Sequence, residues 1–288
     1  MVVDRHLDPL VTEFVPLAGD AASRRTLYLQ TSPEFAMKRL LAAGGEAIYQ
    51  IAHAFRQGEV GRLHNPEFTM VEWYRTGDDL ASGIQLLSDL AEALLERGPA
   101  ERVSYAEVFQ RAAGIDPHRG SIESLRVALQ KRGVVPPESL GEGDRDGWLD
   151  LLLVELVEPT LGHERPAIVY DYPPSQCALA KLRKVEDEPF MARNSVAERF
   201  ELYLGACELA NGYHELNDAA EQRARFERDN ARRRERGLRE LPIDENLLRV
   251  LDDLPGCSGV ALGVDRLLMC LLQTSDIRDV LAFPFSAA

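Results

Sequence analysis

The stretch F-R-Q-G-E-V-G-R-L-H-N-P-E-F-T-M-V-E-W-Y, from Phe55 to Tyr74, is the part of this chain that indicates its fold most directly. It consists of two strand-like runs joined by a polar loop, and Phe68 stands where the second run begins. The loop carries four polar or cationic side chains: Arg56, Arg62, His64 and Asn65. Cationic groups followed by an aromatic ring predict a clamp for a triphosphate with a platform for a base.

A second signature, G-V-A-L-G-V-D-R, extends from Gly259 to Arg266 near the C-terminus. Gly259 and Gly263 precede an arginine that opens an apolar helix, which is expected over Leu267 to Leu272. Glycine lets the backbone approach a ligand closely, and arginine is a permanent cation. This signature therefore predicts a second part of an anion-binding site.

Together the two signatures resemble motifs 2 and 3 of the class II aminoacyl-tRNA synthetases. Three stretches resemble the lysyl-tRNA synthetase group in particular: T-S-P-E-F-A-M-K-R-L (31–40), N-P-E-F-T-M-V-E-W-Y (65–74) and E-L-A-N-G-Y-H-E-L-N-D-A (208–219). Within that group the chain is most similar to the elongation factor P lysine ligases, truncated relatives that attach a lysine-type residue to a protein instead of tRNA. The similarity starts near Thr26, continues to the C-terminus, and is weakest between Gly77 and Pro189.

The 288 residues suit one catalytic domain with a helical insertion at roughly 78–165. Strands and helices in mixed order are typical of an α+β fold with an antiparallel sheet flanked by helices, and the resemblance implies the class II aminoacyl-tRNA synthetase catalytic fold. Ser32 is the expected N-cap of a helix that begins at Pro33. The expected strands are 26–30, 47–55, 167–172 and a pair within 199–209 bent at Gly205; the expected helices are 33–42, 84–95, several within 103–162, and 219–236.

An aminoacyl ligase must hold ATP so that an amino-acid carboxylate attacks the α-phosphorus, which requires cations where charge develops. The resemblance implies that Arg56 binds the α-phosphate and the substrate carboxylate, while Arg62 and His64 reach the terminal phosphates. It implies that Arg266 contacts the γ-phosphate and lies over the adenine, opposite Phe68. Arg56 and Arg266 are thus the expected catalytic residues. The expected ATP-binding residues are Arg56, Gln57, Gly58, Arg62, His64, Asn65, Phe68, Glu208, Leu209, Gly263 and Arg266.

These assignments have simpler alternatives. Considered alone, Arg56 could form a surface ion pair, and Phe68 could be an ordinary core residue. Arg62 and His64 are explained nearly as well by a solvent-exposed loop.

Two glutamates are candidates for a magnesium site. Glu201 and Glu208 are seven apart across the expected bend at Gly205, so antiparallel strands could bring both carboxylates to one place. Magnesium is usually held by one or two carboxylates together with substrate phosphates. Each glutamate alone would fit the solvent face of a strand, and the resemblance favours the metal site over that alternative.

Recognition of lysine requires anions at both amino groups. The resemblance implies that Glu34 binds the backbone-type amine and that Glu72 and Glu215 bind the side-chain ammonium, with Tyr74 as a hydrogen-bonding neighbour. Buried carboxylates are costly unless a cationic ligand compensates them, so these residues should be buried. The full expected substrate-binding set is Ser32, Pro33, Glu34, Glu72, Tyr74, Glu215 and Ala261.

Ala261 stands where lysyl-tRNA synthetases resembling this chain have glycine and the protein-modifying branch has alanine. The resemblance therefore implies a pocket floor shaped for (R)-β-lysine, although a methyl group that simply packs tightly is the alternative.

The chain departs from the family pattern in two places. Motif 2 normally reads F-R-x-E, but Gly58 stands at the position of the glutamate and Glu59 follows it. Motif 1, which builds the class II dimer interface, has no counterpart in M-V-V-D-R-H-L-D-P-L (1–10), so the chain is either truncated or its start is assigned too late. We expect a homodimer in the full-length form and a weaker dimer for this chain.

Composition restricts the partners. A net charge of −14 and a pI near 5.0 argue against broad binding of tRNA, whose affinity depends on Lys and Arg. The basic run 223–239 fits a solvated helix face. The four cysteines show neither zinc-site spacing nor a disulfide framework. No signal segment or long apolar run is visible, which predicts a cytoplasmic protein that does not contact a membrane.

The sequence therefore predicts an ATP- and Mg²⁺-dependent ligase that forms a lysyl-type adenylate and transfers the acyl group to elongation factor P. The alternatives are a tRNA-charging lysyl-tRNA synthetase core, an amino-acid amide synthetase of the same fold, or a catalytically impaired regulatory paralogue. The last is suggested by Gly58 and the missing motif 1. Retention of the charged residues of the predicted site favours an active enzyme.

Overall fold

The computed structural model describes residues 7–17, 23–185 and 195–287. The chain divides into two compact units. The first comprises Met1–Gly77, Leu216–Cys257 and Ala261–Ala288, and the second comprises Asp78–Glu215 and Ser258–Val260. The expectation about motif 1 concerns residues 1–10, of which 1–6 lie outside the described residues.

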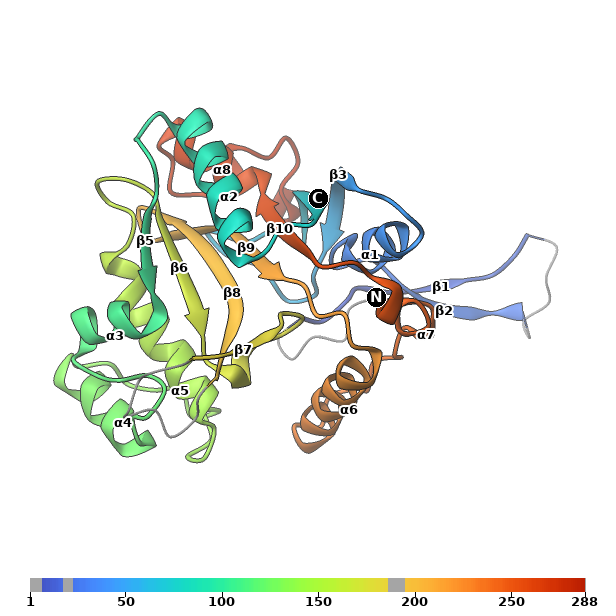
Figure 1. The fold of residues 1–288 in the computed structure, drawn as a ribbon. Helices are drawn as coiled ribbons and strands as arrows, with labels where there is room; N and C mark the ends of the chain where they lie inside the picture. The colour runs from blue at the N-terminus through green and yellow to red at the C-terminus, as the bar shows by residue number, and fades with distance from the viewer. Residues whose placement is uncertain (1–6, 18–22, 186–194, 288) are drawn as a thin grey trace. The chain divides into compact units, whose positions relative to one another are not determined.

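The first unit is built on two antiparallel hairpins (Figure 1). β1 (Val11–Phe14) pairs with β2 (Arg25–Tyr28), and β3 (Ala47–Phe55) pairs with β4 (Glu67–Thr76) along its whole length. β10 (Cys257–Gly263), which contributes residues to both units, is the next neighbour of β4. The other elements of this unit are α1 (Glu34–Ala42), α6 (Ala219–Glu235), α7 (Glu245–Leu248), α8 (Val264–Leu272), η5 (Leu251–Asp253), η6 (Ile277–Asp279) and η7 (Phe285–Ala287).

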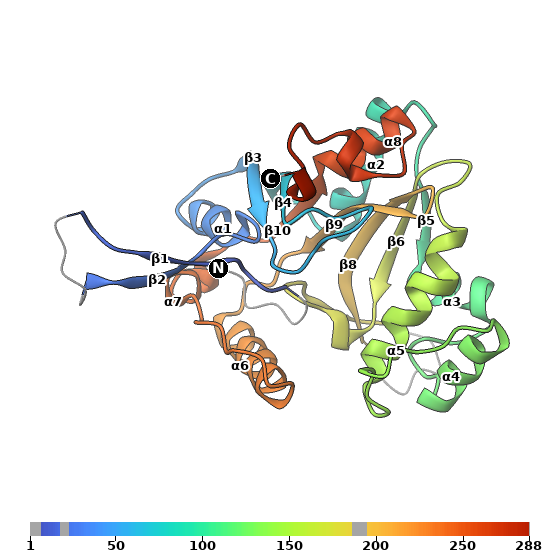
Figure 2. The ribbon, with the colours of Figure 1, turned by 180° about the vertical axis from the view of Figure 1, so that it is seen from behind.

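The second unit contains β9 (Cys207–His214), β8 (Ser195–Leu204), β6 (Ala167–Tyr172) and β5 (Glu101–Ser104) in that spatial order, and β7 (Leu182–Lys184) also pairs with β8. Figure 2 shows α3, α4 and α5 gathered beside β5 and β6. The helical elements are α2 (Leu80–Leu95), α3 (Tyr105–Ala113), α4 (Ile122–Lys131), α5 (Arg145–Leu152), the π-helix η2 (Leu153–Val157), η3 (Glu158–Thr160) and η4 (Pro174–Gln176).

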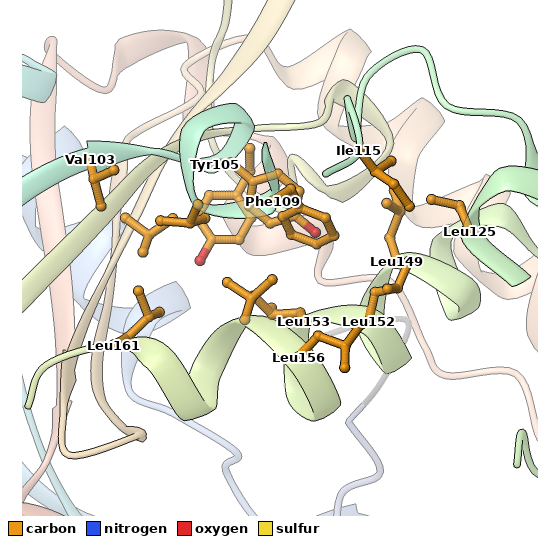
Figure 3. Close-up of a cluster of buried hydrophobic side chains, with 14 of the residues drawn as sticks. Val103, Tyr105, Phe109, Ile115, Leu125, Leu149, Leu152, Leu153, Leu156 and Leu161 are labelled. Carbon is orange, nitrogen blue, oxygen red and sulfur yellow. The ribbon is translucent and has the colours of Figure 1, made fainter. Parts of the chain in front are cut away.

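Hydrophobic side chains from these helices form the core of the second unit. Tyr105 and Phe109 stack with ring centroids 4.4 Å apart, and Tyr105 also contacts the ring of Tyr172 at 4.6 Å. Figure 3 shows the two stacked rings together with leucines contributed by the α5–η2 segment: Leu149, Leu152, Leu153 and Leu156. The dense leucines of 148–157 are therefore core residues, because they bury one face of a helix against aromatic rings.

Several expected elements are confirmed. β3 and β6 have the predicted bounds, and the predicted bend at Gly205 is a tight turn between β8 and β9. Gly205 and Ala206 both have positive φ, 55° and 66°, which matches the twist of a two-residue hairpin.

One local expectation is wrong. α1 begins at Glu34 with Pro33 at the N-cap position, so neither Ser32 nor Pro33 has the predicted role. Ser32 lies one residue before the N-cap position, and its hydroxyl accepts a hydrogen bond from the backbone N–H of Glu34 at 3.0 Å. The pairs β3–β4, β6–β8 and β8–β9 are antiparallel, as expected, and β5 and β6 form a parallel pair. The short β5 run, E-R-V-S, has too few residues to be identified from alternation.

Candidate active site

The β3–β4 hairpin positions the predicted phosphate clamp of the first unit. Ala54 pairs with Phe68, so Arg56 leaves β3 beside the aromatic ring, and its guanidinium carbon lies 4.9 Å from the ring centroid. Arg56 also approaches Glu59, with 3.8 Å between Nη1 and Oε1. Its buried Nε has no hydrogen-bond partner among the described residues. An unsatisfied donor on a half-buried cation is suited to an anionic ligand.

Gly58 lies in the turn that follows Arg56. Its φ is 83°, a left-handed value that a residue with a Cβ rarely adopts. The glutamate of the usual motif 2 pattern would be strained in this conformation. Gln57 and Gly58 are both exposed, and the backbone N–H of Gln57 donates to the carbonyl of Asp8 at 2.7 Å.

The structure brings Arg266 of α8 to the β3–β4 loop. Its Nε donates to the carbonyl of Leu63 at 3.3 Å, and its Nη2 lies 2.6 Å from Nε2 of His64. Local burial and the adjacent Arg266 guanidinium lower the pKa of His64, although part of the ring is open to solvent. A neutral imidazole can accept the hydrogen bond from Arg266, so the pair holds two predicted ATP-binding residues together.

Asn65 and Arg62 are held by the C-terminal segment. The Asn65 amide donates to the carbonyl of Glu67 at 2.6 Å and accepts the backbone N–H of Phe285 at 2.9 Å. The carbonyl of Arg62 accepts the backbone N–H of Ile277 at 2.7 Å, and the Arg62 side chain is exposed. In the described structure the Asn65 side chain therefore fixes the loop, and its contact with ATP remains a prediction.

A residue that the sequence interpretation missed connects the two signatures. The buried Asp265, directly before Arg266, accepts the backbone N–H of Thr69 at 2.6 Å, although the two residues are 196 apart in sequence. Burial raises the pKa of this carboxyl above its usual range. The bond fixes β4, immediately after Phe68, to the first turn of α8. The position of Asp265 inside the second signature is the sequence signal that could have identified this residue.

The predicted lysine-binding carboxylates of the first unit are buried. Glu34 on α1 is 8% exposed and Glu72 on β4 is 1% exposed. The Tyr74 hydroxyl donates to Oε2 of Glu72 at 3.3 Å, because alternate residues of β4 point to the same side. The burial expected for a site that takes a cationic ligand is therefore confirmed for this pair.

The first unit also supplies a cation of its own that sequence reasoning did not include. Lys38, one turn after Glu34 on α1, is 2% exposed, and its Nζ lies 2.6 Å from Oε1 of Glu34. The four-residue spacing between Glu34 and Lys38 is the sequence signal that could have predicted this pair, because residues four apart share one face of a helix.

In the second unit, Glu201 on β8 is the centre of a buried network. Its Oε1 accepts hydrogen bonds from Arg199 and, at 3.2 Å, from the amide of Asn211. Its Oε2 accepts from the hydroxyls of Tyr172, at 2.5 Å, and Tyr203. Burial, followed by the Glu201 charge, raises the pKa of Tyr172 well above its usual value, so the phenol remains a donor.

The β8–β9 register determines how Glu208 lies relative to Glu201. Tyr203 pairs with Glu208 and Leu202 with Ala210, so an irregularity of one residue separates the two pairs. Glu201, Tyr203 and Glu208 consequently lie on one face of the hairpin, since paired residues share a face. Glu208 is half-buried, whereas Leu209 and Glu215 are buried.

The half-buried Glu208 could serve as a carboxylate ligand of a Mg²⁺ ion that takes its other ligands from nucleotide phosphates and water. Each oxygen of Glu201 already accepts two hydrogen bonds, which fill the acceptor positions of that carboxylate, so its predicted role as a second metal ligand does not fit the described network. Within residues 7–17, 23–185 and 195–287, no group of three or more His, Cys, Asp and Glu side chains could hold a metal.

The remaining predicted residues lie on β10 and at its end. Ala261 and Gly263 are half-buried in the first unit, and Gly263 occupies the N-cap position of α8. In the part of the chain that the structure describes, no helix is long and apolar enough to cross a bilayer.

The family follows from comparison with known proteins. Residues 15–287 match the family described as tRNA synthetases class II (D, K and N), so the chain belongs to this family. Its members include the enzymes whose motifs 2 and 3 the two signatures resemble.

Individual relatives narrow the similarity further. The chain is 47% identical over 292 residues to a Vibrio parahaemolyticus protein, covering 100% of this chain and 86% of the relative. It is 49% identical over 283 residues to an Erwinia tasmaniensis protein, covering 98% and 84%. It is 48% identical over 288 residues to a Yersinia enterocolitica protein, covering 100% and 86%. All three relatives are named elongation factor P (R)-beta-lysine ligase.

Proposed function

We propose that this protein is an ATP-dependent ligase that forms an (R)-β-lysyl adenylate and transfers the acyl group to a lysine ε-amine of elongation factor P. The observation that carries the proposal is the pair of buried carboxylates, Glu34 and Glu72, in the same compact unit as the Arg56–Phe68 pair. Glu34 already contacts Lys38, and Glu72 accepts a hydrogen bond from Tyr74. A substrate with two ammonium groups would supply each of these buried carboxylates with a further donor. The names of the relatives support the same substrate.

The proposed first step is adenylation. The substrate carboxylate attacks the α-phosphorus of ATP, a carboxylate–phosphorus bond forms, and the bond to pyrophosphate breaks. Arg56 is suited to hold the α-phosphate and the carboxylate together, because its planar fork can bind two oxygens and its Nε is unsatisfied in the described structure. Arg266 and His64 are held together beside the loop, where they can receive the terminal phosphates.

The proposed second step is acyl transfer. The unprotonated ε-amine of the acceptor lysine attacks the acyl carbon of the mixed anhydride, an amide forms, AMP leaves, and the amine gives up its proton. Glu208 would hold Mg²⁺, which would supply charge neutralisation at the phosphates. Phe68 provides a face on which the adenine can stack.

The acceptor is the finer part of the proposal. The net charge of −14 disfavours a polyanionic acceptor, and the relatives are named for elongation factor P rather than for tRNA. We also propose that the enzyme works in the cytoplasm as a homodimer.

Pyrophosphate exchange followed by acyl transfer tests the function. The wild-type protein should exchange pyrophosphate with (R)-β-lysine more efficiently than with α-lysine, and should modify purified elongation factor P while leaving tRNA uncharged. Glu208→Gln should abolish exchange without changing the thermal unfolding midpoint, and Glu123→Gln, at an exposed glutamate of α4, is the matched control. Efficient charging of tRNA would favour a tRNA synthetase core instead. Exchange absent with every lysine isomer would favour an impaired paralogue.

A further inference from the structure

Helix α1 contains a buried ion pair that the proposed substrate roles leave unexplained. Lys38 Nζ lies 2.6 Å from Oε1 of Glu34, and the side chains are 2% and 11% exposed. A lysine this deeply buried is favoured as a neutral amine unless a charged partner compensates it. The pair is therefore a specific arrangement of two charges and differs from the exposed i,i+4 pairs that decorate helix surfaces.

The backbone around Glu34 is fixed as well. Glu34 is the first residue of α1, and its N–H donates to the Ser32 hydroxyl at 3.0 Å. Phe35, the next residue of α1, packs against Phe226 of α6 with ring centroids 5.7 Å apart. With its backbone fixed and one carboxylate oxygen bound, the Glu34 side chain has little conformational freedom left to lose when a ligand binds.

We propose that Lys38 is a positioning residue for the lysine substrate. Its ion pair orients the Glu34 carboxylate, so that the carboxylate receives the backbone-type amine of the substrate without reorganisation. The inference rests on the proposed function, in which Glu34 binds that amine.

The chemistry of a carboxylate permits this sharing. An ionised carboxylate has two oxygens and about four acceptor positions, so one ammonium donor leaves capacity for a second. Lys38 therefore offsets part of the negative charge of Glu34 and leaves acceptor positions on the carboxylate for the substrate amine. The substrate amine then meets a directional hydrogen-bond acceptor, whereas Glu72, hydrogen-bonded to Tyr74, is left to recognise the side-chain ammonium.

A double-mutant cycle tests the inference. Lys38→Met, Glu34→Gln and the double variant are compared with wild type in pyrophosphate exchange, and KM is measured separately for (R)-β-lysine and ATP. Lys131→Met, which removes an exposed lysine of α4, is the control for the same chemical change. Thermal unfolding of each variant reports stability.

Lys38→Met should raise KM for (R)-β-lysine by roughly tenfold or more, the scale of one charge-assisted hydrogen bond, while KM for ATP changes less than about twofold. In the Glu34→Gln background the same substitution should add no further increase, because its target is gone. Lys131→Met should behave as wild type.

Three results would overturn the inference. They are an unchanged KM for (R)-β-lysine in Lys38→Met, equal increases of both KM values, and additive effects in the double variant. If Lys38→Met does not fold, Lys38→Gln, which retains a donor, should fold and show an intermediate KM for (R)-β-lysine; wild-type kinetics in that variant would also overturn the inference. A wild-type protein that fails to exchange pyrophosphate with any lysine isomer would reject the proposed function and this inference with it. An active wild type with a normal Lys38→Met variant rejects this inference alone.

Discussion

Two tyrosines in contact in the core of the second unit should respond oppositely to loss of their hydroxyls. Tyr172 is 1% exposed and donates to Oε2 of Glu201 at 2.5 Å. Tyr105 is 0% exposed, and its hydroxyl has no hydrogen-bond partner among the described residues. The ring centroids are 4.6 Å apart, so both substitutions by phenylalanine occur in one packing environment. Each leaves the ring in place and removes only an oxygen.

The two magnitudes follow from the hydrogen-bond partners. A hydrogen bond to a charged group contributes about 1.5–3 kcal/mol, so Tyr172→Phe should lower the free energy of unfolding by about 2 kcal/mol. A buried hydroxyl without a partner costs about 1–3 kcal/mol, so Tyr105→Phe should leave stability unchanged or raise it by about 1 kcal/mol. For a chain of this size the difference corresponds to a separation of roughly 3–5 °C between the unfolding midpoints.

Thermal unfolding followed by circular dichroism, with urea unfolding as a second measure, distinguishes the variants. The reasoning is refuted if Tyr105→Phe destabilises the protein as much as Tyr172→Phe does. Such a result would mean that the Tyr105 hydroxyl has a partner in solution, or that the Tyr172 bond to Glu201 contributes nothing.

Three further predictions concern other parts of the chain. Asp265→Ala should raise KM for ATP by roughly tenfold in pyrophosphate exchange, because the N–H of Thr69 loses its acceptor. Asp265→Asn keeps a carbonyl oxygen and should stay near wild type. Equal effects of the two substitutions would contradict this role of Asp265. Burial lowers the pKa of His118 below its ordinary 6.5, so its contribution to stability is present above that pH and lost as pH falls below it. His118→Gln should therefore reduce the loss of urea stability between about pH 7.5 and 5.5, and an unchanged pH dependence would reject the assignment. Gly162→Ala should lower the free energy of unfolding by about 3 kcal/mol, and Gly98→Ala should lower it by about 1 kcal/mol. Both glycines have positive φ, 69° and 73°, but only at Gly162 would an added Cβ meet backbone atoms, at 2.6 Å. Equal unfolding midpoints for the two variants would contradict the predicted clash.

Much of the fold and the candidate site could be predicted from sequence because the determining signals are local. Residues 47–55 and 167–172 form strands with the expected bounds, and the turn at Gly205 follows from the backbone freedom of glycine. The identity of the charged and aromatic residues in the two signatures was sufficient to predict an anion site. The prediction that Glu34, Glu72 and Glu215 are buried was likewise correct.

The partners of those residues were decided by tertiary structure. Asp265 meets Thr69 only because α8 packs on β4, and the two lie 196 residues apart, beyond the reach of any helical or strand period. Glu201 receives Tyr172 from a strand 29 residues earlier, so its buried network could not be read from the spacing to Glu208.

The start of α1 and the pairing of β5 also depend on contacts that the local sequence pattern does not determine. The start of α1 differs by one residue from prediction because the first intrahelical hydrogen bond, from the N–H of Met37, is accepted by the carbonyl of Pro33. The four residues of β5 show no clear period, so their parallel pairing with β6 could not be predicted from the sequence of β5 alone. Residue type and short spacing determined which chemistry this protein contains. Long-range packing, whose hydrogen bonds and ion pairs join residues far apart in the chain, decided how that chemistry is held.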